Sequence, residues 1–197
     1  MKNKALPKTT KDSAATAVRD LVRALALEGK TPELEGTPER VAKLFRQSIL
    51  AGYDVDVRAL LAAHALRAKS NAMVMLHDVP VSTMCPHHLM PAWGTATVAF
   101  QPKGKLLGLG VVADALRALT RRLTLQEECT EAMVEALART IAPTWALCRM
   151  RLVHGCMVTA SPTAERVVVE TLATRGTVPS DVLTSLRSRA RSEGCQP

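Results

Sequence analysis

The chain has 197 residues, of which 47% are hydrophobic, and its formal net charge is +8. This length and composition predict one domain of ordinary size with terminal tails, which is large enough to bury a core. We find no apolar run of about 18 residues and no secretory leader pattern, which predicts a cytoplasmic protein without a membrane span. Its five cysteines, an odd number, fit a reducing compartment rather than a disulfide-stapled fold.

The positive charge is concentrated at the two ends of the sequence. Residues 1–12 hold four lysines and one aspartate, and residues 187–197 hold three arginines and one glutamate. Aromatic side chains, on which single-stranded nucleic acids stack, make up only 3% of the chain. Nucleic-acid binding is therefore disfavoured, and the excess charge is assigned mainly to the tails.

Helical periodicity dominates the first third of the chain. Helices are predicted over residues 13–28, 37–51 and 56–67. Thr37 is expected to cap the second helix because Pro38 suits the first helical position, and Asp56 is expected to cap the third. These helices predict an N-terminal helical extension.

The rest of the chain alternates between strand and helix patterns. Strands are predicted at 72–84 and 95–101, helices at 111–122 and 126–141, strands at 145–154 and 165–174, and a short final helix capped by Ser180. The order ββααββ predicts an α+β fold, with an antiparallel sheet and helices on one of its faces. We therefore divide the chain into a tail and helical region (1–70), a sheet domain (71–178) and a C-terminal helix with a basic tail (179–197).

Two short motifs carry metal-binding chemistry. The first is Cys85-Pro86-His87-His88, and the second is His154-Gly155-Cys156. Each follows or ends a predicted strand, so one sheet could bring them together. Thiolates and imidazoles suit zinc, and three protein ligands leave a fourth position for water, whereas two cysteines and two histidines would make a closed structural site. The residues alone leave open which histidines bind metal and which move protons.

Several blocks of the sequence, in order from about residue 14 to residue 176, resemble the GTP cyclohydrolase I family. They are Thr37 to Lys43, Ser82 to Pro91, Thr95 to Pro102, Gly108-Leu109, Gln126-Glu127 and His154 to Met157. The resemblance implies the tunnelling fold, in which the small sheets of several subunits join into a barrel. It also implies a homo-oligomer, commonly a decamer, with active sites between subunits.

The resemblance also implies roles for individual residues. It implies that zinc is held by Cys85, His88 and Cys156. It implies that His87 and His154 transfer protons and do not bind the metal. Substrate contacts are implied for Glu127, which would accept hydrogen bonds from the guanine edge, and for Gln126 and Arg40.

The chain departs from the family where the triphosphate is expected to bind. Val111 stands where the family has a lysine, and Asp114 and Ala160 stand where it has arginines, so that only Arg40 is kept. Each phosphate normally needs charge-assisted partners, and their loss predicts weak triphosphate binding. Pro86 also replaces the glutamate of the Cys-Glu-His-His motif, which removes a contact next to the metal ligands.

The sequence therefore predicts a zinc-dependent hydrolase that opens the imidazole ring, a cyclic amidine, of a purine or similar heterocycle without a triphosphate. Zinc would lower the pKa of water towards about 7, and a histidine would protonate the departing nitrogen. One alternative is authentic GTP cyclohydrolase I with phosphate contacts relocated to Lys105, Arg121 or Arg122. Another is a non-catalytic, zinc-containing scaffold that binds a purine or pterin.

Overall fold

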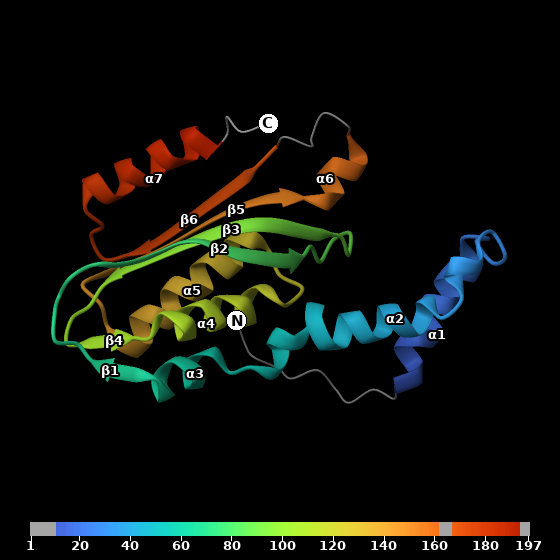
Figure 1. Cartoon of the computed structure of the whole chain (residues 1–197), viewed down its shortest axis with the longest axis horizontal. Helices are drawn as coiled ribbons and strands as arrows, with labels where there is room; N and C mark the ends of the chain where they lie inside the picture. Colours follow the sequence, from blue (N-terminus) through green and yellow to red (C-terminus); the bar gives the residue numbers. More distant parts are fainter. Residues whose placement is uncertain (1–10, 162–166, 194–197) are drawn as a thin grey trace.

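A four-stranded antiparallel sheet forms the centre of the computed structural model, which describes residues 11–161 and 167–193 (Figure 1). Its strands, in the spatial order β2-β3-β5-β6, are β2 (Val74–Met84), β3 (Pro91–Gln101), β5 (Trp145–His154) and β6 (Val169–Arg175). Two three-residue strands, β1 (Ala65–Arg67) and β4 (Lys105–Leu107), form a separate antiparallel pair. The predicted antiparallel sheet is confirmed, and its two edge strands are β2 and β6.

The helices form an N-terminal group, a central pair and two later elements. They are α1 (Lys11–Ala24), α2 (Thr37–Leu44), α3 (Val57–Ala63), α4 (Leu109–Thr120), α5 (Gln126–Ile141), α6 (Gly155–Ala160) and α7 (Ser180–Glu193). Short turns named η1 (Pro32–Leu34), η2 (Phe45–Ile49) and η3 (Ala51–Asp54) connect the N-terminal helices. The hairpin of α1 and α2 extends away from the sheet, as the predicted helical extension requires (Figure 1). None of the described helices is long and apolar enough to cross a membrane.

The main core lies between one face of the sheet and helices α4 and α5 (Figure 1). Alternate residues of β5 enter it, including the fully buried Cys148, Met150 and Leu152. The intervening residues Trp145 and Leu147 point to the opposite face, where they pack against α7. The period of two along β5 therefore gives the sheet two packed faces, one covered by α4 and α5 and the other partly covered by the C-terminal helix.

Most predicted elements have the expected type, and the differences lie at their ends. Asp56 caps α3 as predicted, because its side chain accepts hydrogen bonds from the backbone N–H groups of Arg58 and Ala59. The prediction that Thr37 caps α2 is wrong, since Gly36 occupies the cap position in a left-handed conformation. The hydroxyl of Thr37 instead donates to the carbonyl oxygen of Glu33.

Several predicted elements are shorter or divided in the structure, among them the first helix, which ends at Ala24 and not at residue 28. The helix predicted over 37–51 ends at Leu44 and continues as the η2 and η3 turns. The helix predicted to residue 67 stops at Ala63, because residues 65–67 pair with β4. The last strand begins at Val169, and the first two residues of its predicted range lie outside the described part of the chain. Helix α7 includes Ser180, the residue predicted to precede it as the cap.

Two of the cysteines are core residues. Cys129 and Cys148 are 1% and 0% exposed. Burial raises the pKa of Cys129 to about 12, and it raises the pKa of Cys148 well above its ordinary value. Both thiols are therefore neutral near pH 7, and neither forms a disulfide.

Candidate active site

Strand β3 brings the two metal-binding motifs together. The loop of residues 85–90 joins β2 to β3, and Met84 is paired with Pro91 at the end of that hairpin. On the other side of β3, Ala92 is paired with His154, the last residue of β5. The first motif and the second motif therefore meet at the same end of the sheet, as their positions at strand ends predicted.

Three donor atoms gather at this end of the sheet. The ligand atoms of Cys85, His88 and Cys156 all lie within 4.8 Å of one another. Zinc binds thiolate sulfur at about 2.3 Å and imidazole nitrogen at about 2.0–2.1 Å in a tetrahedron, which separates neighbouring ligand atoms by somewhat under about 4 Å. The Sγ atom of Cys85 lies 3.8 Å from the Nδ1 atom of His88, as this geometry requires. These three residues could therefore hold a metal ion, and the donor set fits zinc.

His87 lies beside this group but is not one of its three members. Its Nδ1 atom is 3.9 Å from the Sγ atom of Cys85, and its ring is nearly perpendicular to the ring of His88, with the centroids 6.3 Å apart. His87 is exposed, so a small molecule can reach it. The arrangement provides one histidine within the group and one at its edge.

Gly155 allows the second motif to pack tightly against the sheet. A Cβ atom at this position would lie 2.8 Å from the carbonyl oxygen of Pro91 and 3.3 Å from the ring of Trp93. Any side chain there would push the start of α6 away from β3. The glycine therefore keeps His154 and Cys156, its two neighbours, close to the first motif.

The start of α5 reaches the same end of the sheet through the loop that precedes it. The backbone N–H of Thr124 donates to the carbonyl oxygen of Met84 at 3.4 Å, next to Cys85. Gln126 and Glu127 follow as the first two residues of α5. Gln126 is 3% exposed, whereas Glu127 is exposed and available to a ligand.

His154 is held by the side chain of Gln126. Its Nε2 atom lies 2.9 Å from the Oε1 atom of Gln126. The Nε2 atom of Gln126 donates to the carbonyl oxygens of Met150 and Val169 and to the hydroxyl of Thr171. The amide group of Gln126 is thus fully used by protein partners.

The sequence analysis missed Thr130 and Thr171, which complete this network. The hydroxyl of Thr130 donates to the carbonyl oxygen of Gln126, four residues earlier in α5, at 2.7 Å. Its oxygen is also 2.7 Å from the hydroxyl oxygen of Thr171 in β6. The spacing of four residues between Gln126 and Thr130 was a visible helical signal, but the contact with β6 was not.

Arg40 lies in the N-terminal extension. Its guanidinium donates to the carbonyl oxygen of Glu33 at 2.9 Å and to the hydroxyl of Thr37 at 2.7 Å. None of its hydrogen bonds among the described residues goes to Cys85, His88 or Cys156, the three residues that we call the metal group. Within one chain, the structure does not bring Arg40 together with the other predicted site residues.

The positions that depart from the family pattern lie on α4 and at the end of α6. Val111 and Asp114 belong to α4, and Ala160 is the last residue of α6. The carboxylate of Asp114 is paired with Arg117 at 2.7 Å on the same helix. These positions therefore present an apolar side chain, a carboxylate and a methyl group, and no cation.

Arg122 is a structural residue and not a free cation. It is 3% exposed and donates to the carbonyl oxygens of Ala118 and Val55. Its guanidinium lies 5.6 Å from the ring centroid of Tyr53. Burial lowers its pKa, and nearby groups led by Tyr53 partly oppose this effect. Among the sequence candidates for relocated phosphate contacts, only Lys105 and Arg121 are exposed.

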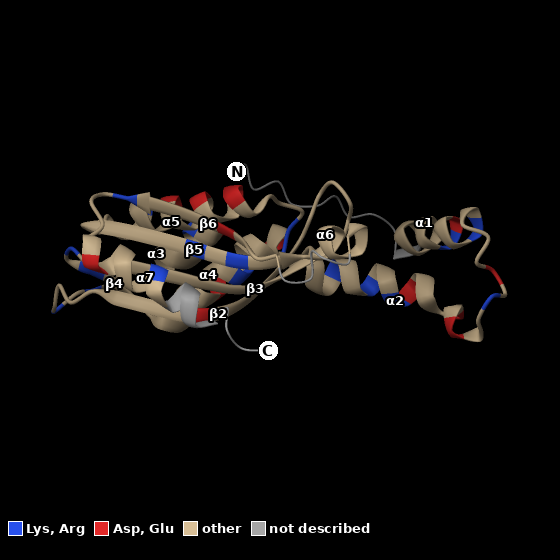
Figure 2. Cartoon of the chain, turned by 90° about the horizontal axis from the view of Figure 1, so that it is seen from above, with Lys and Arg blue, Asp and Glu red and all other residues tan. Residues whose placement is uncertain are grey.

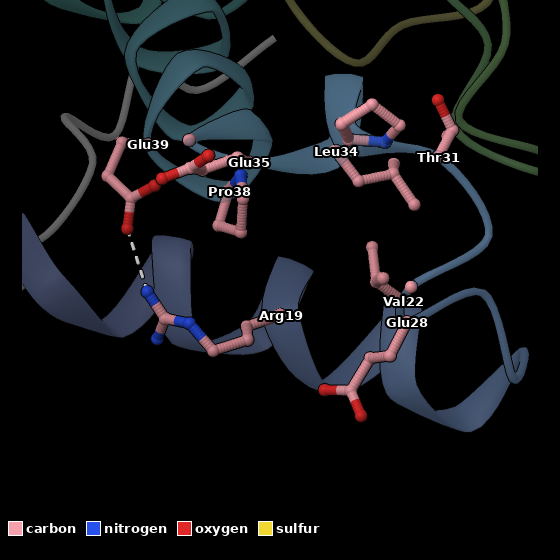
Figure 3. A pocket seen from close by; sticks show the side chains of 11 residues that line it. Arg19, Val22, Glu28, Thr31, Leu34, Glu35, Pro38 and Glu39 are labelled. Carbon is pink, nitrogen blue, oxygen red and sulfur yellow. Dashed lines mark hydrogen bonds and ion pairs between the residues drawn. The ribbon is translucent and has the colours of Figure 1, made fainter.

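A cavity of about 580 Å³ lies elsewhere, between α1, η1 and the start of α2 (Figure 3). An ion pair between Arg19 and Glu39 crosses it at 2.7 Å, and Glu28 and Glu35 also line it. None of the predicted site residues is in its lining. Basic and acidic residues are interspersed along this hairpin (Figure 2), and the lining of the cavity does not include Cys85, His88 or Cys156.

The chain is similar in sequence to proteins of one known family. Residues 14–191 match the family GTP cyclohydrolase I. GTP cyclohydrolase 1 of Chlorobaculum tepidum is 33% identical over 90% of this chain and 77% of that protein. GTP cyclohydrolase 1 of Halalkalibacterium halodurans is 32% identical over 89% of this chain and 93% of that protein. Among solved structures, apo archaeosine synthase QueF-Like is similar over 56% of this chain and all of that chain, with a TM-score of 0.42 and 20% identity. The chain therefore belongs to the GTP cyclohydrolase I family, and its α+β architecture is the tunnelling fold of that family.

Proposed function

We propose that the protein is a zinc-dependent hydrolase that opens the imidazole ring of a purine or similar heterocycle that lacks a triphosphate. The observation that carries the proposal is the group of Cys85, His88 and Cys156, whose ligand atoms lie within 4.8 Å of one another with His154 nearby in sequence. Three ligands from two strand ends match an open catalytic site rather than a closed structural one.

The metal ligands and the remaining histidines have separate tasks in this proposal. Cys85, His88 and Cys156 would hold zinc, which, when bound, supplies Lewis-acid activation of water near neutral pH. His154 would give a proton to the ring nitrogen that departs, because an imidazole ring can both take up and release a proton. His87, exposed at the edge of the group, would move a second proton. Hydrolysis adds one water and opens one C–N bond, which leaves a formamide-like product.

Glu127 and Gln126 would orient the heterocycle. The exposed carboxylate of Glu127 can accept two N–H bonds from a planar edge like that of guanine. The side chain of Gln126 is already engaged, so its substrate contact would come from its main-chain N–H at the start of α5. Arg40 would meet a single anionic group from the N-terminal extension.

We infer the charge of the substrate from the three positions at which this chain is expected to lack a cation of the family. A triphosphate needs several cations in a partly desolvated site, and each charge-assisted contact is worth roughly 1.5–3 kcal/mol. Val111 and Ala160 offer none, and Asp114 adds a carboxylate that only Arg117 partners among the described residues. These changes support a substrate with at most one charged group.

A second candidate is authentic GTP cyclohydrolase I, which the names of the relatives favour. It requires phosphate contacts from other residues, and Lys105 and Arg121 are the exposed candidates. A third is a zinc-containing scaffold that binds a purine or pterin without turnover. The intact His87 and His154 support an enzyme over the scaffold.

We propose that the active form is a homo-oligomer, with a decamer as the expected size. Strands β2 and β6 are the edges of the sheet, and each can pair with a neighbouring chain. Arg40 hydrogen-bonds within its own extension and not to the metal group, so it would serve a site shared between subunits. A monomer in light scattering at micromolar concentration would contradict this assembly.

The function can be tested with purified, zinc-loaded protein. Nucleobases, nucleosides and nucleotides, GTP among them, are incubated with it, and loss of the purine absorbance is followed. Turnover of a nucleobase or nucleoside above GTP supports the proposal. Efficient turnover of GTP favours the second candidate, and tight binding without turnover of any compound favours the scaffold.

A further inference from the structure

The amide of Gln126 has one orientation that satisfies its neighbours. Its nitrogen faces the carbonyl oxygens of Met150 and Val169 at 3.2 and 3.0 Å, and carbonyl oxygens only accept hydrogen bonds. If the nitrogen and the oxygen of the amide were exchanged, the amide oxygen of Gln126 would face both carbonyl oxygens, and no hydrogen bond could form. The Oε1 atom of Gln126 must therefore be the atom that faces His154.

The hydrogen bonds of Thr130 and Thr171 independently require the same orientation of the Gln126 amide. The hydroxyl hydrogen of Thr130 is used on the carbonyl oxygen of Gln126, so Thr171 donates to Thr130 across their 2.7 Å contact. The oxygen of Thr171 then has a free lone pair for the side-chain nitrogen of Gln126, which lies 3.1 Å away. The network forms a closed, directional ring in which the orientation of Gln126 is the only consistent one.

We infer that Gln126 is a positioning residue that fixes the ring of His154 with hydrogen on Nε2 and a lone pair on Nδ1. The contact between Oε1 of Gln126 and Nε2 of His154 is 2.9 Å, and an amide oxygen can only accept there. Among the residues that the structure describes, Nδ1 of His154 has no hydrogen-bond partner. It is thus the ring nitrogen available to a reacting molecule, and it gives a proton to a departing nitrogen only after it has taken one up.

The contact joins three separate elements of the fold. Gln126 begins α5, His154 ends β5, and Val169 begins β6. Because Gln126 is 3% exposed, water does not compete strongly for its amide. The network therefore ties the orientation of His154 to the packing of α5 on the sheet, and the role of this orientation in proton transfer rests on the proposed function.

The first test uses the unaltered, zinc-loaded protein and needs no substrate. Solid-state NMR of protein labelled with ¹⁵N-histidine separates ring nitrogens that carry hydrogen from those with a lone pair, and the signals of His154 are those lost in the His154→Ala variant. We expect neutral His154 to carry its hydrogen on Nε2 with the shift of a hydrogen-bonded donor. Hydrogen on Nδ1 in the neutral ring would overturn the inference.

The second test compares Gln126→Met, Gln126→Glu and Glu131→Gln, the last an exposed position on the same helix. Gln126→Met removes the acceptor, so the hydrogen-bond shift of His154 should disappear and kcat should fall about 10- to 100-fold. KM should stay within about twofold because the side chain does not touch the substrate. Gln126→Glu keeps an acceptor towards His154 but places its second oxygen against the carbonyl oxygens of Met150 and Val169, so it should be less stable than the wild type. Glu131→Gln should match the wild type.

The rates are measured with guanosine and GTP, and melting curves show that each variant is folded. A rise in KM without a fall in kcat would assign the side chain of Gln126 to substrate binding and would overturn the positioning role. If the wild type turns over neither these two compounds nor any other purine of the screen described above, the proposed function fails, and the NMR result on the unaltered protein still decides the inference about Gln126.

Discussion

The guanidinium of Arg117 lies 2.7 Å from the carboxylate of Asp114, one turn earlier on α4. The resemblance implies that the family has an arginine at the position of Asp114, where this chain has one half of an ion pair. Both side chains are about half exposed, at 47% and 60%, and such pairs contribute little to stability. The pair therefore adds little to the stability of α4, and we propose that its effect is on the charge that α4 presents to a ligand.

The first prediction concerns the charge of the substrate. The triple variant Val111→Lys, Asp114→Arg, Ala160→Arg restores the family cations and should raise kcat/KM for GTP, relative to guanosine, at least about 10-fold. The reason is that each restored cation gives a phosphate a charge-assisted partner. The measurement is steady-state kinetics with both compounds.

A matched control adds the same net charge elsewhere. The variant Asp20→Lys, Asp181→Lys changes two exposed carboxylates on α1 and α7 and should leave the ratio of the two kcat/KM values unchanged. Equal gains in both variants would show that overall charge, and not the pocket, determines GTP turnover. Efficient GTP turnover by the wild type would contradict the prediction that the wild-type site binds a triphosphate weakly.

The second prediction concerns the metal. Cys156→Ala removes one of the three clustered ligand atoms and should release zinc at neutral pH, measured as zinc per chain after dialysis. Cys148→Ala is the matched control, because Cys148 is fully buried and burial keeps its thiol neutral by raising its pKa. We expect about one zinc per chain in the wild type and in the control. Full zinc occupancy in Cys156→Ala would refute the ligand assignment.

The third prediction separates the histidines. His88→Ala should lose zinc, whereas His87→Ala and His154→Ala should keep it and lose about 10²- to 10⁴-fold in turnover, the usual contribution of acid–base residues. His87 and His88 have Nδ1 atoms 3.9 and 3.8 Å from the sulfur of Cys85, so distance to that one atom does not distinguish them. Loss of zinc from the His87 variant would reverse their roles.

The sequence was sufficient to predict where the two motifs would meet. Each motif lies at the C-terminal end of a strand. Because β2 and β5 both run antiparallel to β3, these two strand ends lie at the same end of the sheet. The pairings of Met84 with Pro91 and of Ala92 with His154 confirm this expectation. The alternation of apolar and polar residues and the turn residues beside each strand predicted where the strands end, and both are local features of the sequence.

Other features could not be predicted from local signals. The contact between Gln126 and His154 depends on how α5 is rotated against β5, which only packing determines. The three-residue strands near Leu66 and Leu106 are too short to show a period, and so is the six-residue α6. The burial of Arg122 could not be predicted either, because an arginine between two helices is normally expected at the surface.

The fourth prediction tests the structural role of Arg122. Arg122→Met should lower the free energy of unfolding by about 1–3 kcal/mol, because the carbonyl oxygens of Ala118 and Val55 lose a buried donor. Its exposed neighbour is the control, and Arg121→Met should stay within about 0.5 kcal/mol of the wild type. Urea denaturation at one fixed protein concentration gives both values. Equal stability of the two variants would contradict the assignment.

The fifth prediction concerns stability at alkaline pH. Burial raises the pKa of Cys129 from 9.0 to about 12, with Arg122 opposing the shift. Below pH 9 the thiol is neutral in both the folded and the unfolded chain, so it adds no pH dependence. Between pH 9 and about pH 12 only the unfolded chain loses the proton, so stability falls as the pH rises.

At pH 10 this difference amounts to about 1.4 kcal/mol for one thiol. The test compares the free energy of unfolding at pH 8 and pH 10 for the wild type and for Cys129→Ala, since every other titrating group is common to both. We expect the wild type to lose about 1.4 kcal/mol more than the variant over this range, whatever the cavity costs the variant at pH 8. Parallel losses in the two proteins would show that the thiol of Cys129 ionises as easily in the folded chain as in the unfolded one.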